Sequence, residues 1–203
     1  MLKVNWPMKN VKLRIGAVCF LGITLFSTPR VRAQEQKIDV QKSNLTVHVY
    51  KTGLFSAFAH DHDIFAPIAR GTAEISGHAS VNLEVDARTL RVMDPGISDK
   101  DRAEIQTNML GAEVLDSERF HEIIFQSTSA EPNGAEHWIV HGNLTVHGQT
   151  QPVTVEASRQ AGHFTGQVTI KQTSFGIKPI RIAGGAVKVK DDVVIEFDVQ
   201  LAQ

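Results

Sequence analysis

The chain has 203 residues, one cysteine and a formal charge of −1, with 21 basic residues against 22 acidic ones. Six of the basic residues and none of the acidic ones lie in residues 1–33, so the rest of the chain has 15 basic against 22 acidic residues and a formal charge of −7. An acidic chain releases few counterions from a phosphate backbone, which excludes nucleic acid as an expected partner. The one cysteine, Cys19, also lies in residues 1–33, so disulfides and thiol catalysis are excluded for the remainder.

Residues 1–33 have the three parts of a secretory signal peptide. A basic run ends at Arg14, and the apolar stretch that follows, from Ile15 to Phe26, is shorter than the ~20 residues needed to span a bilayer. Val31-Arg32-Ala33 then supplies the residues that a signal peptidase reads. We expect cleavage after Ala33, a periplasmic or secreted protein, and one domain over residues 34–203. An uncleaved anchor is the alternative, and no other segment is apolar enough to enter a membrane.

Apolar and polar residues alternate along the remainder with a period of two. Val47 and Val49, for example, alternate with Thr46, His48 and Tyr50. Strict alternation predicts antiparallel strands with one buried face and one solvated face. Turn residues separate these strands. The expected turns are Gly77-His78, Asn133-Gly134, Gly148 to Pro152, Ala161-Gly162, Gly184-Gly185 and Asp191-Asp192.

One segment departs from this pattern and predicts a helix over about residues 98–110. Ser98 is a capping residue, and Ile105 and Met109 fall on one face. The closely spaced hairpins favour an up-and-down meander of roughly eight strands, which closes into a barrel able to hold one ligand. The expected fold is therefore an all-β, eight-stranded antiparallel β-barrel. Its one helix lies in a long connection, residues 94–120, that serves as a lid or plug.

Inward-facing apolar residues define the expected ligand channel. Small residues at inward positions, such as Ala73 and Ala157, favour a channel over a filled core. The expected lining residues are Val47, Val49, Phe55, Phe58, Leu83, Phe125, Leu144, Val146, Ile170, Phe175 and Phe197.

The most concentrated polar cluster is His60-Asp61-His62-Asp63. On a strand His60 and His62 share a face, so they are the candidates for chelating a metal if a third ligand joins them. Because an isolated H-x-H pair is a weak signal, the preferred interpretation is a hydrogen-bonding cluster at the barrel mouth, with no metal and no cofactor. His147 lies on the polar parity and is expected on the outer face, and Arg102 is expected in a surface salt bridge.

Motifs of catalysis are missing from the sequence. It contains no G-x-S-x-G, no H-E-x-x-H, no phosphate loop and no dinucleotide fingerprint. We therefore expect the protein not to be an enzyme.

Four segments between Ile38 and Leu201 follow one another in a recognisable order. They are Ser43 to Gly71, Arg102 to Phe125 (with Leu110 to Asp116 and Arg119-Phe120), Gly142 to Val153 and Thr173 to Ile177. In this order they resemble the YceI family of bacterial exported proteins. The resemblance implies a lipocalin-like barrel whose apolar tunnel holds a polyisoprenoid or polyprenyl quinone. Two departures stand out: His121 replaces the family's usual proline, and residues 59–63 are richer in histidine and aspartate.

The leading hypothesis is thus an exported protein that binds an isoprenoid lipid. The first alternative is a histidine-dependent metal-binding protein or hydrolase. The second is a structural or stress-associated barrel with a filled core and no lipid. A homodimer is left open.

Overall fold

The computed structural model describes residues 35–52, 61–182 and 187–202. These residues form twelve strands, one α-helix and two short 3-10 helices. The strands are β1 (Gln36–Lys37), β2 (Asn44–Thr52), β3 (His62–Phe65), β4 (Ile68–Glu74), β5 (Ser80–Asp86), β6 (Arg91–Val92), β7 (Glu122–Pro132), β8 (His137–Val146), β9 (Gln149–Gln160), β10 (His163–Lys171), β11 (Arg181–Ile182) and β12 (Val187–Gln200). The helices are η2 (Ala87–Thr89), α1 (Asp99–Leu110) and η3 (Gln172–Phe175).

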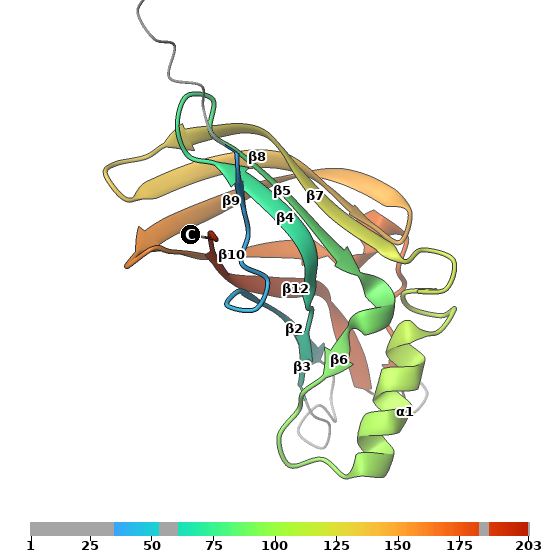
Figure 1. Cartoon of the computed structure of the whole chain (residues 1–203). Coiled ribbons are helices and arrows are strands. Elements are labelled where there is room, and N and C mark those ends of the chain that lie inside the picture. Colours follow the sequence, from blue (N-terminus) through green and yellow to red (C-terminus); the bar gives the residue numbers. More distant parts are fainter. Residues whose placement is uncertain (1–34, 53–60, 183–186, 203) are drawn as a thin grey trace, which may run out of the picture. The chain divides into compact units, whose positions relative to one another are not determined.

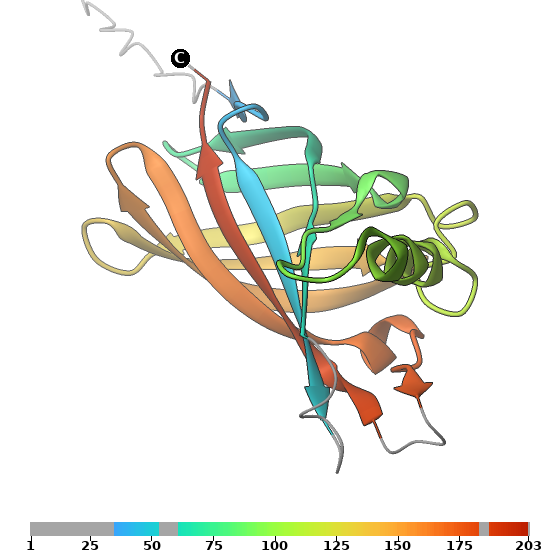
Figure 2. The ribbon, with the colours of Figure 1, turned by 90° about the horizontal axis from the view of Figure 1, so that it is seen from below.

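The strands form a single antiparallel sheet that curls round on itself (Figure 1). From β5 the sheet runs through β7, β8, β9, β10, β12 and β2 to β3. In Figure 2, β12 (red) lies between β2 (blue) and β10 (orange). Only Ala66 and Pro67 separate β3 from β4, and β4 pairs with β5, so the sheet returns to the strand from which it started. A bridge between Ile38 and Leu201 links the residues that follow β1 and β12.

The expected all-β class, antiparallel pairing and single helix are confirmed, but the expected count of eight strands is wrong. One long strand is broken in two at Pro67, because proline has no N–H to donate to a neighbouring strand. At the break the chain bends, and the Ala66 N–H donates to the Leu45 carbonyl at 2.9 Å. The other additional strands, β1, β6 and β11, have two residues each and are too short to show any alternation.

A turn expected at Asp191-Asp192 is also wrong, because both residues lie inside β12. The pairing of β12 with β2 shifts register between Val189 and Val193, which marks a bulge. The two carboxylates are used there: Asp191 accepts hydrogen bonds from the backbone N–H and the hydroxyl of Thr173, and Asp192 accepts one from Lys171. A bulge inside one strand and a turn between two strands look alike in sequence.

The turn expected at Ala161-Gly162 is present, but the turn expected from Gly148 to Pro152 is wrong in its bounds, because residues 149–152 lie in β9 and the turn consists of His147 and Gly148. His147 and Gly148 join β8 to β9 with φ of 50° and 69°, and Ala161 and Gly162 join β9 to β10 with φ of 50° and 88°. Positive φ at both central residues matches the right-handed twist of the strands. The turn expected at residues 184 and 185 lies outside the described residues.

Helix α1 begins one residue after the expected start and ends where expected. The Ser98 hydroxyl accepts a hydrogen bond from the Asp101 N–H at 3.1 Å and caps the helix. Asp99 and Asp101 lie in the first turn, where the helix dipole favours negative charge. At the other end the Gly111 N–H donates to the Thr107 carbonyl at 3.0 Å.

Candidate functional site: an apolar cavity inside the curled sheet

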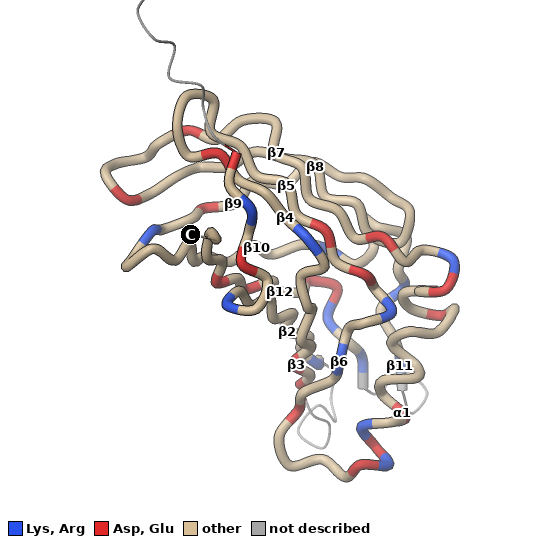
Figure 3. Tube along the Cα trace, in the orientation of Figure 1, with Lys and Arg blue, Asp and Glu red and all other residues tan. Residues whose placement is uncertain are grey.

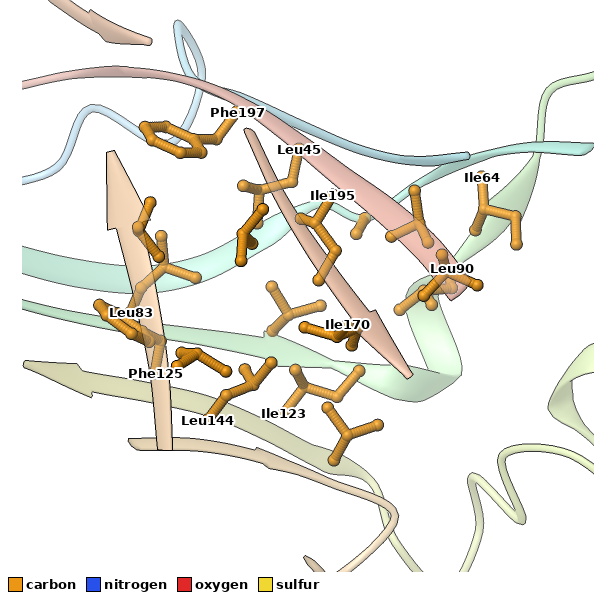
Figure 4. Close-up of a pocket in the computed structure, with 18 of the residues that line it drawn as sticks. Leu45, Ile64, Leu83, Leu90, Ile123, Phe125, Leu144, Ile170, Ile195 and Phe197 are labelled. Atoms are coloured by element: carbon orange, nitrogen blue, oxygen red, sulfur yellow. The ribbon is translucent and has the colours of Figure 1, made fainter. Parts of the chain in front are cut away.

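The inner face of the curled sheet surrounds a cavity of about 530 Å³. This volume lies within the ~300–1,000 Å³ range of sites that enclose small organic ligands. Figure 4 shows aliphatic and aromatic side chains from strands on all sides pointing into it, with Phe197 and Phe125 toward one end and Ile64 and Leu90 toward the other. A core filled by large aliphatic side chains would leave no such space.

Nine of the eleven residues expected to line a channel border this cavity. They belong to six strands and to η3, where Phe175 is only 2% exposed. That they contact a lipid stays a prediction, and Phe55 and Phe58 lie outside the described residues. The nine are Val47, Val49, Leu83, Phe125, Leu144, Val146, Ile170, Phe175 and Phe197.

Two glycines make room for the two large phenylalanine rings of the lining. A Cβ on Gly142 would lie 2.6 Å from the ring of Phe125, and a Cβ on Gly166 would lie 2.6 Å from the ring of Phe197. Real Cβ atoms do not approach other atoms so closely, so each ring occupies space that only glycine leaves free. Each ring therefore lies against the backbone of the glycine in the neighbouring strand.

One end of the cavity is lined by residues near the hairpin turns. Trp138 on β8 and Phe164 on β10 lie with ring centroids 5.6 Å apart, and both border the cavity. Ile75, just after β4, borders the cavity and is 42% exposed, so apolar surface continues to the outside here. The sequence analysis did not predict Trp138 and Phe164 as lining residues. Trp138 could have been predicted, because it lies six residues before Leu144 on the same strand and therefore on the same face.

The other end is closed by α1, which is attached to the edge strand β6 by hydrogen bonds. The side-chain amide of Gln106 accepts from the Val92 N–H at 2.9 Å and donates to the Leu90 carbonyl at 2.7 Å. Arg102 donates to the carbonyls of Val92 and Asp94 at 3.1 and 2.8 Å. The surface salt bridge expected for Arg102 is therefore wrong. These bonds hold α1 so that Ile105 and, one turn later, Met109 face the cavity.

A buried aspartate and a histidine form the main polar feature of this end. His62 borders the cavity, and its Nδ1 lies 2.5 Å from Oδ2 of Asp94, which is 2% exposed. The other carboxylate oxygen of Asp94 accepts from the Asp63 N–H at 2.7 Å. Asp94 was missed in the sequence, because its use depends on β6 bringing it beside β3, and no local pattern reveals that contact.

Asp63, the residue after His62, points to the outer face of the sheet. His48 Nδ1 lies 2.7 Å from Oδ1 of Asp63, and His48 Nε2 lies 3.2 Å from Oε2 of Glu196. The hydrogen bond to Asp63 is the largest of the causes that raise the pKa of His48 above its ordinary value, and Glu196 adds to the effect against the opposing cost of burial. This group lies on the outside of β2, β3 and β12, away from the cavity.

That His60 and His62 chelate a metal stays a prediction, because His60 lies outside the described residues. Within residues 35–52, 61–182 and 187–202, no three His, Cys, Asp or Glu side chains are grouped to hold a metal ion. In the same ranges no helix is long and apolar enough to cross a membrane.

His147 does not lie on the outer face of a strand, contrary to expectation. It occupies the turn between β8 and β9, is half-buried, and its ring meets that of Phe120 with centroids 4.6 Å apart. Its Nδ1 lies 3.2 Å from the Phe175 carbonyl. The strand ends one residue before His147, so the alternation could not place it.

Comparisons with known proteins agree with this architecture. The sequence profile of the family described as "YceI-like domain" matches residues 36–201. The chain is 28% identical to a UPF0312 protein of Shewanella oneidensis and 28% identical to a UPF0312 protein of Shewanella baltica, in each case over 87% of this chain and 93% of the relative. Among solved structures, that of Burkholderia cenocepacia BcnA is similar with a TM-score of 0.63 and 18% identity, covering 82% of this chain and 99% of that one. At this identity the likeness concerns the fold.

Proposed function

Because the chain belongs to the family of YceI-like domains, we propose that it is an exported protein that holds an isoprenoid lipid inside its curled sheet. The observation that carries the proposal is the cavity itself: about 530 Å³, bordered almost entirely by apolar side chains. The only acidic residues among the described lining residues are Glu74 and Glu104. A binding role, rather than catalysis, follows from a lining that offers apolar contact and few polar groups.

The size of the hydrophobic term fits a flexible isoprenoid chain. Each isoprene unit moved from water into an apolar channel gains roughly 3–4 kcal/mol, at ~0.8 kcal/mol per carbon. Four units therefore gain about 12–16 kcal/mol, against an association cost on the order of 4–15 kcal/mol. The gain exceeds the cost over most of this range, so chains of about four units or more are expected to bind, with the polar end near His62 and Glu104, which border the cavity.

The test is to identify the lipid that the protein carries in its own cell envelope. We expect native mass spectrometry of the purified protein to show an adduct, and lipid extraction to yield an isoprenoid in near-equimolar amount. The matched variants are Leu144→Asp, on the cavity side of β8, and Thr145→Asp, next to it on the outer side. Thr145→Asp is expected to keep the adduct. An extract without isoprenoid would refute the proposal.

Export is the second part of the proposal. It is supported by the basic run and apolar stretch of residues 1–33. Sequencing of the purified protein is expected to give Gln34 as the first residue, and Met1 retained on a cytosolic protein would refute it. A metal-binding role is tested by metal analysis: stoichiometric zinc that is lost on replacing His60 and His62 by alanine would favour that alternative.

A further inference from the structure

The hydrogen bond between His62 and Asp94 fixes which ring nitrogen of the histidine carries a proton. Oδ1 of Asp94 already accepts the Asp63 N–H at 2.7 Å. A carboxylate only accepts hydrogen bonds, so the proton between it and His62 belongs to Nδ1. In the neutral ring Nε2 then has a lone pair and no hydrogen. Among the described residues no group donates to Nε2, and His62 borders the cavity.

The other polar groups at this end are also poor partners for an anion. Glu104 and Asn108 of α1 border the cavity one helical turn apart, and Glu104 is an acceptor when ionised. Figure 3 shows basic and acidic residues intermixed over the strands and α1. In the described ranges none of the lysines or arginines borders the cavity. A phosphate or carboxylate brought here would meet the carboxylate of Glu104, which is exposed so that solvent weakens the repulsion, and an acceptor nitrogen that offers it no hydrogen bond.

We propose that His62 Nε2 accepts a hydrogen bond from a terminal hydroxyl of the bound lipid, so that the site selects hydroxyl-ended chains over ether-ended and anionic ones. This inference rests on the proposed function and adds the head-group chemistry to it. His62 is the specificity-determining residue, and Asp94 is a positioning residue that sets the ring proton. A ligand without a donor leaves the Nε2 lone pair unpaired on binding, which costs affinity.

The experiment compares three ligands with the same four-isoprene tail: geranylgeraniol, its methyl ether and its monophosphate. Affinities are measured by displacement of a fluorescent apolar probe from lipid-free full mature protein. The ether keeps the oxygen and the tail but has no hydrogen to donate. We expect the alcohol to bind about tenfold more tightly than the ether, the worth of one well-formed hydrogen bond in a desolvated site, and the phosphate to bind more weakly than the alcohol.

Variants identify the residues responsible. His62→Phe is expected to bind the alcohol and the ether equally, with the ether affinity unchanged. Asp94→Asn keeps an oxygen for the Asp63 N–H but presents an N–H to Nδ1, which moves the ring proton to Nε2; the preference for the alcohol is then expected to vanish although the imidazole remains. His141→Phe, an exposed histidine on the outer side of β8, is the matched control and is expected to keep the tenfold preference. Thermal melts show whether each variant is folded.

The outcomes separate the two proposals. Equal binding of alcohol and ether by the wild-type protein overturns the hydroxyl inference and leaves the isoprenoid proposal standing. Tighter binding of the phosphate, or a preference that survives both His62→Phe and Asp94→Asn, also overturns it. If none of the three ligands displaces the probe, both proposals are wrong.

Discussion

Ala73 offers a test of whether the space inside the sheet is real. It lies on β4, borders the cavity, and pairs with Val81 of β5, which borders the cavity too. In Ala73→Leu three carbon atoms enter the cavity, and their removal from water is worth about 2 kcal/mol at ~0.8 kcal/mol per carbon. The side chain loses roughly 0.5–1 kcal/mol of rotamer entropy. We therefore expect Ala73→Leu to raise the free energy of unfolding of the lipid-free protein by about 1–2 kcal/mol.

The same substitution in a tightly packed core would have the opposite sign, because overpacking destabilises by roughly 1–3 kcal/mol. The measurement is urea unfolding followed by tryptophan fluorescence, with affinity for geranylgeraniol measured in parallel. The added side chain takes room from the ligand, so affinity is expected to fall while stability rises. Asn82→Leu, exposed on the outer side of β5, is the control and is expected to change stability by less than about 0.5 kcal/mol. A destabilised Ala73→Leu with unchanged affinity would refute the cavity.

Three further predictions test the lining, the glycines and the outer histidine. Leu144→Asp, at a position only 7% exposed, is expected to destabilise the fold by several kcal/mol in urea unfolding, because an unpaired carboxylate is buried; a loss no larger than that of Thr145→Asp would contradict this. Gly166→Ala is expected to cost about 1–3 kcal/mol, because its Cβ would clash with the backbone oxygen of Glu156 and lie 2.6 Å from the Phe197 ring, whereas Gly162→Ala, with open space around it and φ of 88°, is expected to cost about 1 kcal/mol of backbone strain; equal effects would contradict the close packing around Gly166. The pKa of His48 is raised in the folded protein, so its stabilising contribution is complete below the unfolded pKa of ~6.5 and is lost as pH rises through the folded pKa. His48→Gln is therefore expected to weaken the loss of unfolding free energy as pH rises above about 6.5, by less than about 1 kcal/mol because both carboxylates are largely exposed; an unchanged pH profile in urea unfolding would contradict it.

The alternation of apolar residues was enough to place the expected strand residues on the inner face of the sheet. Strand residues such as Val47 and Leu144 have an unambiguous parity, and a strand in a curled sheet has only an inside and an outside. The helix was found for a comparable reason, since Ser98 and the acidic first turn are local signals.

The features that escaped prediction depend on contacts between distant segments. Pro67 is visible in the sequence, but nothing local shows that β3 and β4 pair with different neighbours on either side of it. The Asp191-Asp192 pair was interpreted as a turn because its partners, Thr173 and Lys171, belong to another part of the chain. Asp94 escaped prediction for the same reason, because it contacts His62 only once β6 has paired with β3.

The hydrogen bonds of Gln106 and Arg102 have a consequence for association as well as for the cavity. β6 pairs with β3 on one side, and on the other side it would present unpaired backbone groups on which a strand of another chain could grow. The side chains of α1 occupy the N–H of Val92 and the carbonyls of Leu90 and Val92 instead. The helix thus gives the edge of the sheet a partner that cannot be extended, which protects it against edge-to-edge aggregation.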